Sequence, residues 1–355
     1  MSEQYVGTVP VQERSRFDVK ALERYLRDHV EGFRGPLEVD QFKGGQSNPT
    51  FLLKAGGSRY VLRKKPSGPL LPSAHAVDRE YRVITALRDT AVPVARSLCF
   101  CEGTDVIGTP FYVMAHVDGR VLWDPTLPGM QIAERAAIYD EMNRVISALH
   151  SVDVDIVGLS GYGRGGNYLR RQIGRWTKQY QASQTEPIDA MNRLVDWLPE
   201  HPLSGETTSI VHGDLRLDNL IFHPTEPRIL AVLDWELSTL GDPLADFAYH
   251  MLTWHLTAQE FRGMAGTNLA SLGVPSADAY LQTYLSRTGR GAIDPQVWDF
   301  YLVFNMFRLA AILQGIAKRV EDGTAANDTA RETGRQARPI AELAWRRATE
   351  RLDAC

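Results

Sequence analysis

The stretch that decides the fold is residues 210–246, IVHGDLRLDNLIFHPTEPRILAVLDWELSTLGDPLAD. Its pattern predicts a strand end, a polar loop, a short apolar run, a turn and a second apolar strand. Asp214 and Asn219 fall in the first loop, and Asp234 follows the second strand. Such a set can surround one ion and one hydroxyl, as phosphoryl transfer requires. The same residue types could be turn formers of a hairpin, but their joint pattern favours a catalytic interpretation.

Length and composition set the broad class of the protein. The 355 residues are enough for two lobes, each with its own core. With 44% hydrophobic residues, 23% charged residues and a net charge of −4, the chain has the composition of an ordinary soluble protein. A domain that binds DNA electrostatically is usually clearly basic. We therefore expect neither a nucleic acid nor a membrane as partner.

The cysteines and the first residues indicate a cytoplasmic protein. Cys99, Cys101 and Cys355 are too few and too irregularly spaced for a disulfide framework or a metal site. The first residues lack the basic and apolar regions of a secretory signal. We also find no run of about 18 apolar residues that would span a bilayer.

Residues 1–115 are expected to form a small β-rich lobe that binds a nucleotide. Residues 1–16 are polar and predict a loose arm. The remaining elements are helices over residues 17–33 and 74–89 and five strands over residues 37–43, 51–54, 60–64, 94–101 and 106–115.

A small, flexible loop joins the first two of these strands. It consists of Gly44, Gly45, Gln46, Ser47 and Asn48. Backbone N–H groups of such a loop can lie over phosphates. Glycine pairs and Ser-Asn steps are equally common in hairpins, so the loop by itself supports both interpretations.

A cation and an acid stand at a suggestive spacing in this lobe. Glu80 lies on the predicted helix, 17 residues after Arg63 on the predicted strand YVLRK. Such a pair can direct a positive charge at the phosphates of a nucleotide. The alternative is an exposed ion pair, which would contribute little.

Residues 116–355 are expected to form a mostly helical lobe. The apolar run that ends at Ala115 turns polar at His116, which predicts a hinge. The expected helices cover residues 131–150, 161–184, 248–256, 279–286, 296–320 and 329–352, with a loop over 323–328. The helix over 296–320 is strongly apolar and is expected to be buried in the core.

One segment of this lobe is strongly basic. Residues 161–185 hold five cations and no acid: Arg164, Arg170, Arg171, Arg175 and Lys178. The segment could be a solvated helix face or a patch that attracts an anionic substrate.

The motif HGDLRLDN, followed by Leu-Asp-Trp 20 residues after its first aspartate and then by Gly-Asp-Pro, resembles the aminoglycoside phosphotransferase family. That family includes choline kinase-like members. The resemblance covers about residues 37–310 and implies an α+β, two-lobed, protein-kinase-like fold, with lobes over 1–115 and 116–355. The segments VLRKKP, RRQIGRWTKQY, HGDLRLDNLIFHP and LDWELSTLGDPLAD are most similar to the branch found fused to, or encoded beside, acyl-CoA dehydrogenases.

The motif residues have distinct expected roles. Asp214 would accept or orient the proton of the attacking hydroxyl. Asn219 and Asp234 would bind Mg²⁺, which prefers hard oxygen ligands. His212 is expected to brace the loop through hydrogen bonds. Asp242 and Asp246 are expected to fix the loop geometry.

The resemblance also implies ATP as the phosphoryl donor. Its contacts would come from Arg63, Glu80, the loop of residues 44–48, and Met114 and His116 beside the hinge. Arg63 stands where the family is expected to have a lysine, and Lys64 is its rival for the phosphate contact. GTP instead of ATP, and the oligomeric state, stay open.

Two departures from the protein-kinase pattern point to a small acceptor. Asp234 is followed by Trp235 and Glu236 rather than Phe-Gly, and the short interval before Gly241 leaves no room for an activation loop. Trp235 and Glu236, together with Arg171 and Arg175, are the candidate acceptor contacts.

The charge of the basic segment favours a neutral or anionic acceptor over a polycation. The resemblance to the acyl-CoA dehydrogenase-associated branch implies a hydroxyacyl-CoA, whose phosphates the basic segment fits. The alternatives are an aminoglycoside or choline-type kinase and a non-catalytic kinase-like binding module. A metal hydrolase is disfavoured because the nine histidines form no HxH or HExxH pattern.

Overall fold

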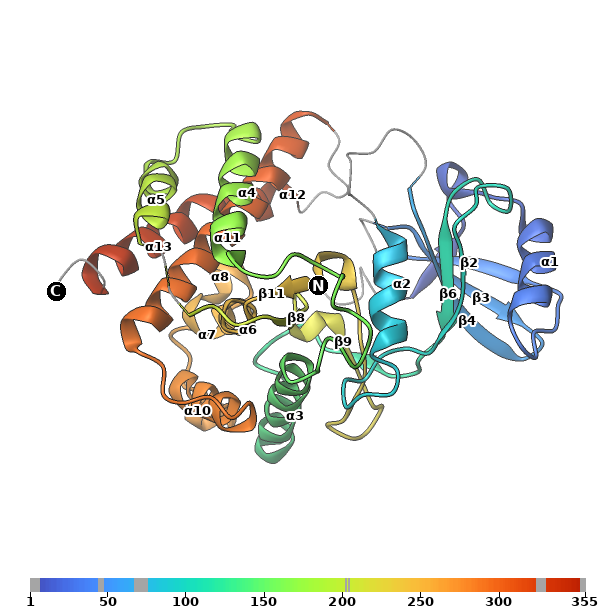
Figure 1. Ribbon diagram of the computed structural model, residues 1–355, viewed down its shortest axis with the longest axis horizontal. Helices are drawn as coiled ribbons and strands as arrows, with labels where there is room; N and C mark the ends of the chain where they lie inside the picture. Colours follow the sequence, from blue (N-terminus) through green and yellow to red (C-terminus); the bar gives the residue numbers. More distant parts are fainter. Residues whose placement is uncertain are drawn as a thin grey trace. The chain divides into compact units, whose positions relative to one another are not determined.

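The computed structural model describes residues 7–43, 48–66, 76–201, 203, 205–323 and 330–351. The chain divides into two compact units (Figure 1). The first unit comprises Met1–Trp123, Ile156–Leu159 and Asp218–Ser238. The second comprises Asp124–Asp155, Ser160–Leu217 and Thr239–Cys355. Residues 210–246 therefore contribute to both units.

The first unit is built on a six-stranded antiparallel sheet. Its strand order is β1-β2-β3-β4-β6-β5. The strands are β1 (Thr8–Pro10), β2 (Glu38–Phe42), β3 (Thr50–Ala55), β4 (Ser58–Lys64), β5 (Ser97–Cys101) and β6 (Phe111–Ala115). Helices α1 (Val19–His29) and α2 (Val77–Ala86) belong to the same unit.

Side-chain alternation in the central strands separates a core face from a polar face. Leu62 of β4 and Val113 of β6 are cross-strand partners, are fully buried, and pack in one apolar cluster with Leu22 and Leu26 of α1. The neighbouring pair, Arg63 and Tyr112, points to the opposite face because successive strand residues alternate. Figure 1 shows α1 and α2 on opposite sides of this sheet. The register therefore sends Arg63 toward α2.

Two expectations for this unit were wrong in detail. Residues 8–10 are not part of a loose arm but form β1, which pairs with β2 from Thr8↔Phe42 to Pro10↔Asp40. The sheet consequently has six strands rather than five. Main-chain hydrogen bonds to an edge can order a segment that side-chain pattern does not reveal, and Pro10 is tolerated because β1 is an edge strand. Strand β6 begins at Phe111 rather than at residue 106, because the preceding residues form a turn.

A second, three-stranded antiparallel sheet also belongs to the first unit. It consists of β7 (Arg120–Val121), β9 (Leu220–Phe222) and β10 (Ile229–Val232) in the order β10-β9-β7. A Cβ atom at Gly119 would collide with the Phe222 carbonyl oxygen and the Ile221 side chain. Only glycine therefore permits this close approach of the two strands.

The second unit is mostly helical. Its strands β8 (Ser209–Val211) and β11 (Thr239–Gly241) form an antiparallel pair. Its helices are α3 (Ile132–His150), α4 (Tyr168–Ala182), α5 (Asp189–Glu200), α6 (Pro243–His250), α7 (Leu252–His255), α8 (Ala258–Phe261), α9 (Leu269–Leu272), α10 (Ala277–Arg287), α11 (Pro295–Glu321), α12 (Ala330–Arg335) and α13 (Ala337–Arg351).

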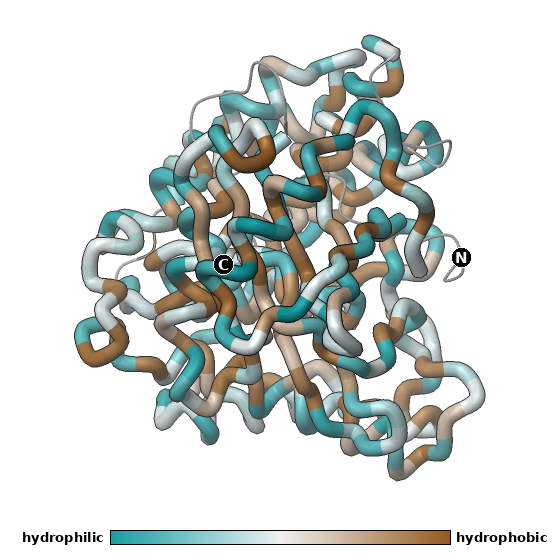
Figure 2. The backbone as a smooth tube through the Cα atoms, turned by 90° about the vertical axis from the view of Figure 1, so that its right-hand side faces the viewer, coloured by the Kyte–Doolittle hydropathy of each residue, from teal (hydrophilic) through white to brown (hydrophobic). Residues whose placement is uncertain are grey.

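Helix α11 is the core of the second unit, as predicted. It packs against α4, α6, α12 and α13. By length and composition it could cross a membrane, but 83% of its most apolar window is buried inside the protein. Figure 2 shows hydrophobic and hydrophilic residues interleaved along the backbone, as amphipathic elements require. The burial of α11 identifies it as a core helix.

Several helix boundaries differ from the expectation. Helix α4 begins at Tyr168, not at residue 161, because the Glu206 carboxylate accepts the backbone N–H groups of Tyr168 (2.7 Å) and Leu169 (3.1 Å). A cap that lies 38 residues away is not visible in the local pattern. The expected closing helix is divided into α12 and α13 at Gln336, and α5 was not anticipated. Most of the expected loop over 323–328 lies outside the described residues.

Candidate functional site

A buried ion pair organises the polar face of the first unit. The Nε atom of Arg63 on β4 lies 3.1 Å from Oε2 of Glu80 on α2. The Nη2 atom of Arg63 donates to Oδ1 of Asp234 at 3.1 Å. Arg63 thus connects two carboxylates from distant parts of the chain, one on a helix and one two residues after the end of β10.

Glu80 is almost completely buried, with 1% of its surface exposed. Its carboxylate accepts hydrogen bonds from the Asn48 side-chain amide (2.6 Å) and from the Tyr112 hydroxyl (3.0 Å). Burial raises the pKa of Glu80, although Arg63 and both hydrogen bonds act in the opposite direction. For Arg63, burial would lower the pKa, but Glu80 and Asp234 are among the groups that raise it above its ordinary value. The guanidinium is therefore fixed in its charged form.

The structure brings Arg63, and not Lys64, to Glu80. Lys64 is the next residue on β4, so its side chain points to the other face of the sheet. It is 2% exposed, and burial lowers its pKa. The alternation of side chains along the strand residues YVLRK accounts for this placement.

Asp234 lies two residues after the end of β10 in a left-handed conformation, with φ of 63°. Aspartate is one of the few non-glycine residues that adopt this conformation readily. The 3-10 turn that follows it, Trp235–Leu237, packs against α2, and Arg79 of α2 donates to the Ser238 carbonyl at 3.2 Å. The backbone geometry of Asp234 is therefore fixed by its surroundings.

Asn219 lies close to Asp234 in the first unit. The Asn219 carbonyl accepts the backbone N–H of Leu233 at 2.8 Å, which places Asn219 beside the end of β10. Among the described residues no group of three or more His, Cys, Asp or Glu side chains could hold a metal ion. An amide and a carboxylate fit Mg²⁺ because this ion commonly completes its shell with phosphates and water.

The other nucleotide candidates lie in different parts of the first unit. Residues 44–47 of the predicted phosphate loop lie outside the described residues, whereas Asn48 is buried against Glu80. Met114 is on β6, paired with Val61, and is 9% exposed. His116 follows β6; burial and the nearby Arg59 lower its pKa.

Trp235 and Glu236 occupy the turn after Asp234. Trp235 is 3% exposed, and its Nε1 donates to the Val232 carbonyl at 3.0 Å. This contact favours a structural role for the Trp235 side chain. Glu236 is partly exposed and adds to the negative potential at Arg63.

In the second unit, Asp246 of α6 holds the acidic loop. Its carboxylate accepts the backbone N–H groups of His212 and Gly213, each at 2.8 Å, and lies 3.1 Å from Nε2 of His150. Gly213 has φ of 85°, which glycine adopts without strain. The backbone N–H of Asp214 donates to Nδ1 of His212 at 3.2 Å. These contacts fix the main chain on the N-terminal side of Asp214.

The Asp214 carboxylate is surrounded by polar partners of the same unit. Nε of Arg216 lies 2.9 Å from Oδ1 of Asp214. The neighbouring Tyr249 is buried, and burial and the Asp214 carboxylate raise its pKa. The imidazole of His250 contacts the Leu215 carbonyl through Nδ1 at 2.9 Å. The loop is therefore braced on both sides of Asp214.

Asp242 stabilises the start of α6. Its carboxylate accepts the backbone N–H of Leu244 (2.8 Å) and the Tyr301 hydroxyl (2.8 Å). This is a helix cap, so Asp242 positions Asp246 rather than contacting a substrate. The bracing residues His150, Tyr249 and His250 were not anticipated from the sequence. Their apolar surroundings gave them the pattern of core positions.

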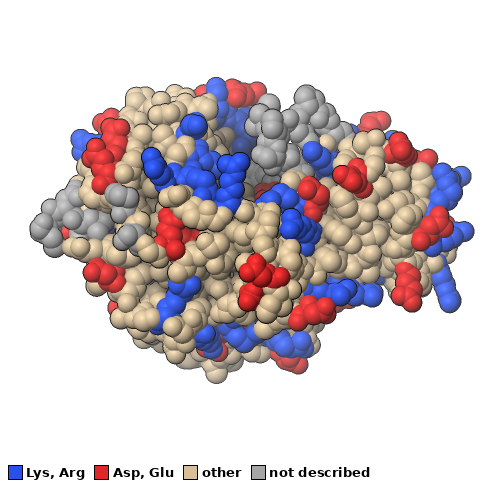
Figure 3. Space-filling model, viewed as in Figure 1, with Lys and Arg blue, Asp and Glu red and all other residues tan. Residues whose placement is uncertain are grey.

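The basic segment divides into groups with different surroundings. Arg171 donates to the carbonyl groups of Arg164 and Gly166 and so holds the loop before α4. Arg175 is exposed, and its guanidinium carbon lies 5.2 Å from the centroid of the Trp176 ring. Figure 3 shows Lys and Arg side chains gathered where Figure 1 draws α4. Exposed cations therefore gather on this face, which fits both alternatives that the sequence leaves open.

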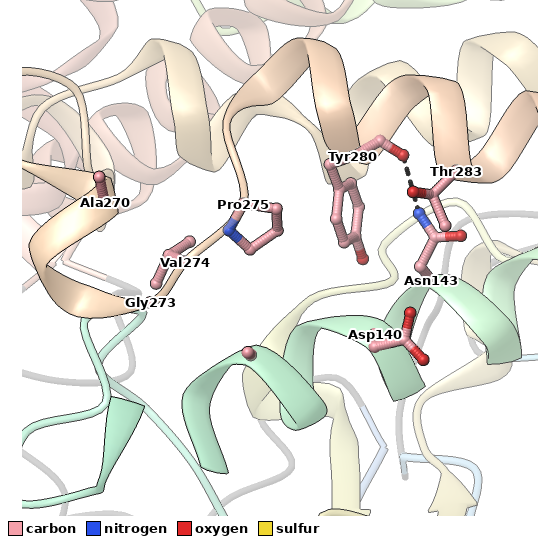
Figure 4. A pocket seen from close by; sticks show the side chains of 9 residues that line it. Asp140, Asn143, Ala270, Gly273, Val274, Pro275, Tyr280 and Thr283 are labelled. Carbon is pink, nitrogen blue, oxygen red and sulfur yellow. Dashed lines mark hydrogen bonds between the residues drawn. The ribbon is translucent and has the colours of Figure 1, made fainter. Parts of the chain in front are cut away.

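A separate pocket of about 260 Å³ lies in the second unit between α3, α10 and the segment before α10 (Figure 4). Its polar side chains have protein partners. Asp140 is bound by Arg287 at 2.8 Å and 2.9 Å, and the Asn143 amide donates to the Tyr280 carbonyl at 2.9 Å. The pocket therefore offers little to direct a polar ligand.

The two units together define a class of protein. A strand cation paired with a helix carboxylate and a strand-end aspartate is a nucleotide-binding arrangement of kinase-like enzymes, and a braced acidic loop supplies their base. Residues 38–311 match the model of the phosphotransferase enzyme family. The chain belongs to this family, and the resemblance drawn from its sequence is confirmed. The chain is therefore a member of a family of phosphotransferase enzymes.

Individual relatives agree with this assignment. The chain is 46% identical over 347 residues to acyl-CoA dehydrogenase family member 10 of Mus musculus, a match that covers 97% of this chain and 32% of that protein. The chain thus spans about a third of the length of this curated relative. Similarity to proteins with this name confirms the expected branch.

Solved structures confirm the expected α+β, protein-kinase-like fold. A putative aminoglycoside phosphotransferase from Ralstonia eutropha is 57% identical, with a TM-score of 0.86, over 94% of this chain and 99% of that one. The aminoglycoside phosphotransferase APH(4)-Ia in complex with AMP-PNP and hygromycin B has a TM-score of 0.59 at 17% identity, over 93% of this chain and 99% of that one. The second likeness concerns the fold alone.

Proposed function

We propose that the protein transfers the γ-phosphoryl group of ATP to a hydroxyl group of a hydroxyacyl-CoA, with Mg²⁺ as cofactor, in the cytoplasm. The observation that carries the donor half is the buried network of Arg63, Glu80 and Asp234. Burying Arg63 beside two carboxylates costs desolvation energy, and a role of Arg63 in binding a phosphate would explain why such a costly cation is placed there. AMP-PNP in a fold relative supports a nucleoside triphosphate as donor.

In this proposal the residues divide the chemistry as follows. Asp214 takes the proton of the acceptor hydroxyl, and the oxygen of that hydroxyl forms a bond to the γ-phosphorus. The bond from the γ-phosphorus to the bridging oxygen breaks, and ADP leaves. Asn219 and Asp234 would hold Mg²⁺, which when bound neutralises charge on the β- and γ-phosphates. Arg63 contributes a fixed positive charge to the same phosphates.

The acceptor assignment rests on charge and on the relatives. Exposed cations of the α4 region, with no acid between residues 161 and 185, favour an anionic acceptor over an aminoglycoside or choline. The relative from mouse is named an acyl-CoA dehydrogenase family member, which supports an acyl-CoA as the acceptor. The exposed Lys178 and Arg170 of α4 would meet the CoA phosphates.

The test is turnover with ATP and Mg²⁺ across 3-hydroxyacyl-CoAs, 4-hydroxyacyl-CoAs, an aminoglycoside and choline, with products identified by mass spectrometry. We expect phosphorylated hydroxyacyl-CoA. Phosphorylation of the aminoglycoside or choline alone would replace the acceptor. Nucleotide binding without transfer to any acceptor would instead favour a kinase-like binding module.

A further inference from the structure

The second unit contains a buried cation that has no acidic partner among the described residues. Arg308 of α11 is 5% exposed. Its Nη2 donates to the Gly213 carbonyl, and its Nε is buried without a hydrogen-bond partner in the described structure. The Tyr249 and Trp176 rings lie 4.5 Å and 5.4 Å from its guanidinium carbon. Aromatic faces compensate only part of the desolvation of such a charge.

A second cation shares the same aromatic ring. The guanidinium carbon of Arg175 lies 5.2 Å from the Trp176 centroid, and no carboxylate is among the groups that act on the pKa of Arg175. Trp176 is 4% exposed, and in the described part of the chain its Nε1 has no acceptor. Burial and the proximity of Arg308 lower the pKa of Arg175. Two guanidinium groups of like charge therefore lie beside the Trp176 ring, and both Nε of Arg308 and Nε1 of Trp176 lack a hydrogen-bond partner in the described structure.

This cluster lies beside the residue proposed as the base. Gly213, whose carbonyl holds Arg308, directly precedes Asp214, and consecutive Cα atoms are about 3.8 Å apart. Tyr249 contacts both the Arg308 guanidinium and the Asp214 carboxylate. When the hydroxyl of an acceptor reaches Asp214, an acceptor group that lies a few bonds from this hydroxyl would therefore be beside Arg308.

We propose that Arg308 and Arg175, with the Trp176 N–H, bind an acyl oxygen of the acceptor, and that they select acceptors whose hydroxyl lies a few carbons from the acyl carbon. The inference rests on the proposed phosphotransferase function and adds the acceptor subsite. The acyl oxygen is either the carboxylate of a free hydroxy acid or the carbonyl of its thioester. The CoA phosphates do not fit this position because the pantetheine arm separates them from the hydroxyl.

The experiment compares acceptors that differ only near the hydroxyl. We would measure KM and kcat for 3-, 4- and 5-hydroxypentanoyl-CoA, free 4-hydroxypentanoate, and 1,4-pentanediol, which lacks the acyl oxygen. Arg175→Gln is the principal variant because this residue is exposed and does not hold the loop. Arg308→Lys keeps the charge but removes the fork. Arg319→Gln, an exposed arginine of the same helix, is the matched control.

We expect kcat/KM to depend on the position of the hydroxyl group along the acyl chain. We also expect Arg175→Gln to raise the KM of acyl acceptors about tenfold, with little change for the diol and in kcat. Arg308→Lys should raise the acyl KM at least as much, and it can also lower kcat because Arg308 donates to the Gly213 carbonyl. The comparison of free acid with thioester shows which acyl oxygen is bound. Acceptor-independent ATP hydrolysis reports the integrity of the catalytic loop. Unchanged acyl KM in both variants, or an equal loss with acyl acceptors and diol in Arg175→Gln, would overturn the inference.

A failure of the proposed function can be distinguished from a failure of the proposed acyl subsite. If the wild-type protein phosphorylates none of these compounds, calorimetry without ATP measures their binding directly. Binding that weakens in Arg175→Gln but not in Arg319→Gln would support the subsite. If the wild-type protein binds none of the acyl compounds, the subsite is wrong as well.

Discussion

The Nε atom of Arg63 lies 3.1 Å from the Glu80 carboxylate, and this ion pair joins the central strand β4 to helix α2 inside the first unit. Glu80 is 1% exposed and Arg63 is 9% exposed. Removing one member of such a pair leaves the other as an uncompensated buried charge.

We predict that Arg63→Met raises the KM for ATP about tenfold or more, because the fixed positive charge is lost. We also predict that Glu80→Gln lowers the free energy of unfolding by about 3 kcal/mol. Nucleotide kinetics and urea unfolding test the two statements. Lys64→Met tests the rival cation and Lys65→Met is the control. A raised KM for ATP in Lys64→Met but not in Arg63→Met would transfer the phosphate role to Lys64.

The second prediction concerns the left-handed backbone of Asp234. Asn tolerates this conformation, so Asp234→Asn should fold normally but need at least about tenfold more Mg²⁺ for half-maximal rate. Asp234→Ala should show the same defect and lose about a further 1 kcal/mol of stability. Titration of Mg²⁺ and thermal unfolding measure both effects. An Asp234→Asn enzyme with the Mg²⁺ dependence of the wild type would remove Asp234 from the metal site.

The third prediction assigns the base. Asp214→Asn preserves the size of the side chain but cannot accept the proton, so kcat should fall by roughly 10² to 10⁴. The affinity for ATP should stay within about twofold, because this change leaves the nucleotide-binding residues intact. Rapid-quench turnover and a fluorescent nucleotide report the two quantities. Comparable turnover in Asp214→Asn would show that another group accepts the proton.

The fourth prediction concerns pH. Burial lowers the pKa of His250 from 6.5 to about 4. As pH falls below 6.5, the unfolded chain binds a proton at this histidine, whereas the folded protein does not until the pH approaches 4. The contribution of His250 to the free energy of unfolding is therefore complete above pH 6.5 and is lost progressively toward pH 4. The free energy of unfolding should fall by about 2 kcal/mol between roughly pH 7.5 and pH 5.

Urea unfolding at the two pH values measures this change. His250→Gln keeps a donor for the Leu215 carbonyl but does not titrate, so its stability should depend less on pH. His201→Gln, at an exposed position, should keep the wild-type dependence. Equal pH dependence in wild type and His250→Gln would show that another group is responsible.

The local sequence pattern was sufficient to predict several helices and strands and the direction of their side chains. The helical period of residues 296–320 predicted the core helix α11, and the alternation of YVLRK with the helix after it predicted that Arg63 meets Glu80. These predictions succeed because side-chain direction follows from the periods of strand and helix. The motif around Asp214 was recognisable from the types and spacing of its residues and from its resemblance to a known family.

Contacts between distant segments were not recognisable. The Asp246 carboxylate caps N–H groups 33 and 34 residues away and contacts His150, which is 96 residues away. Strand β1 owes its order to the edge of β2, and α4 begins where Glu206 caps it. Each of these features depends on a partner that no local window contains.

The sequence by itself therefore determined the phosphotransferase class, through the motif around Asp214 and Asn219, the aspartate Asp234 and the strand cation Arg63. Only the tertiary structure decided how these groups are held and charged. It buried Glu80 with Arg63, braced the loop of Asp214, and placed Arg308 in an aromatic surrounding without a described acid. The physical reason is that residue type and spacing fix which groups are available, whereas burial and long-range contacts fix their charge, partners and unused capacity.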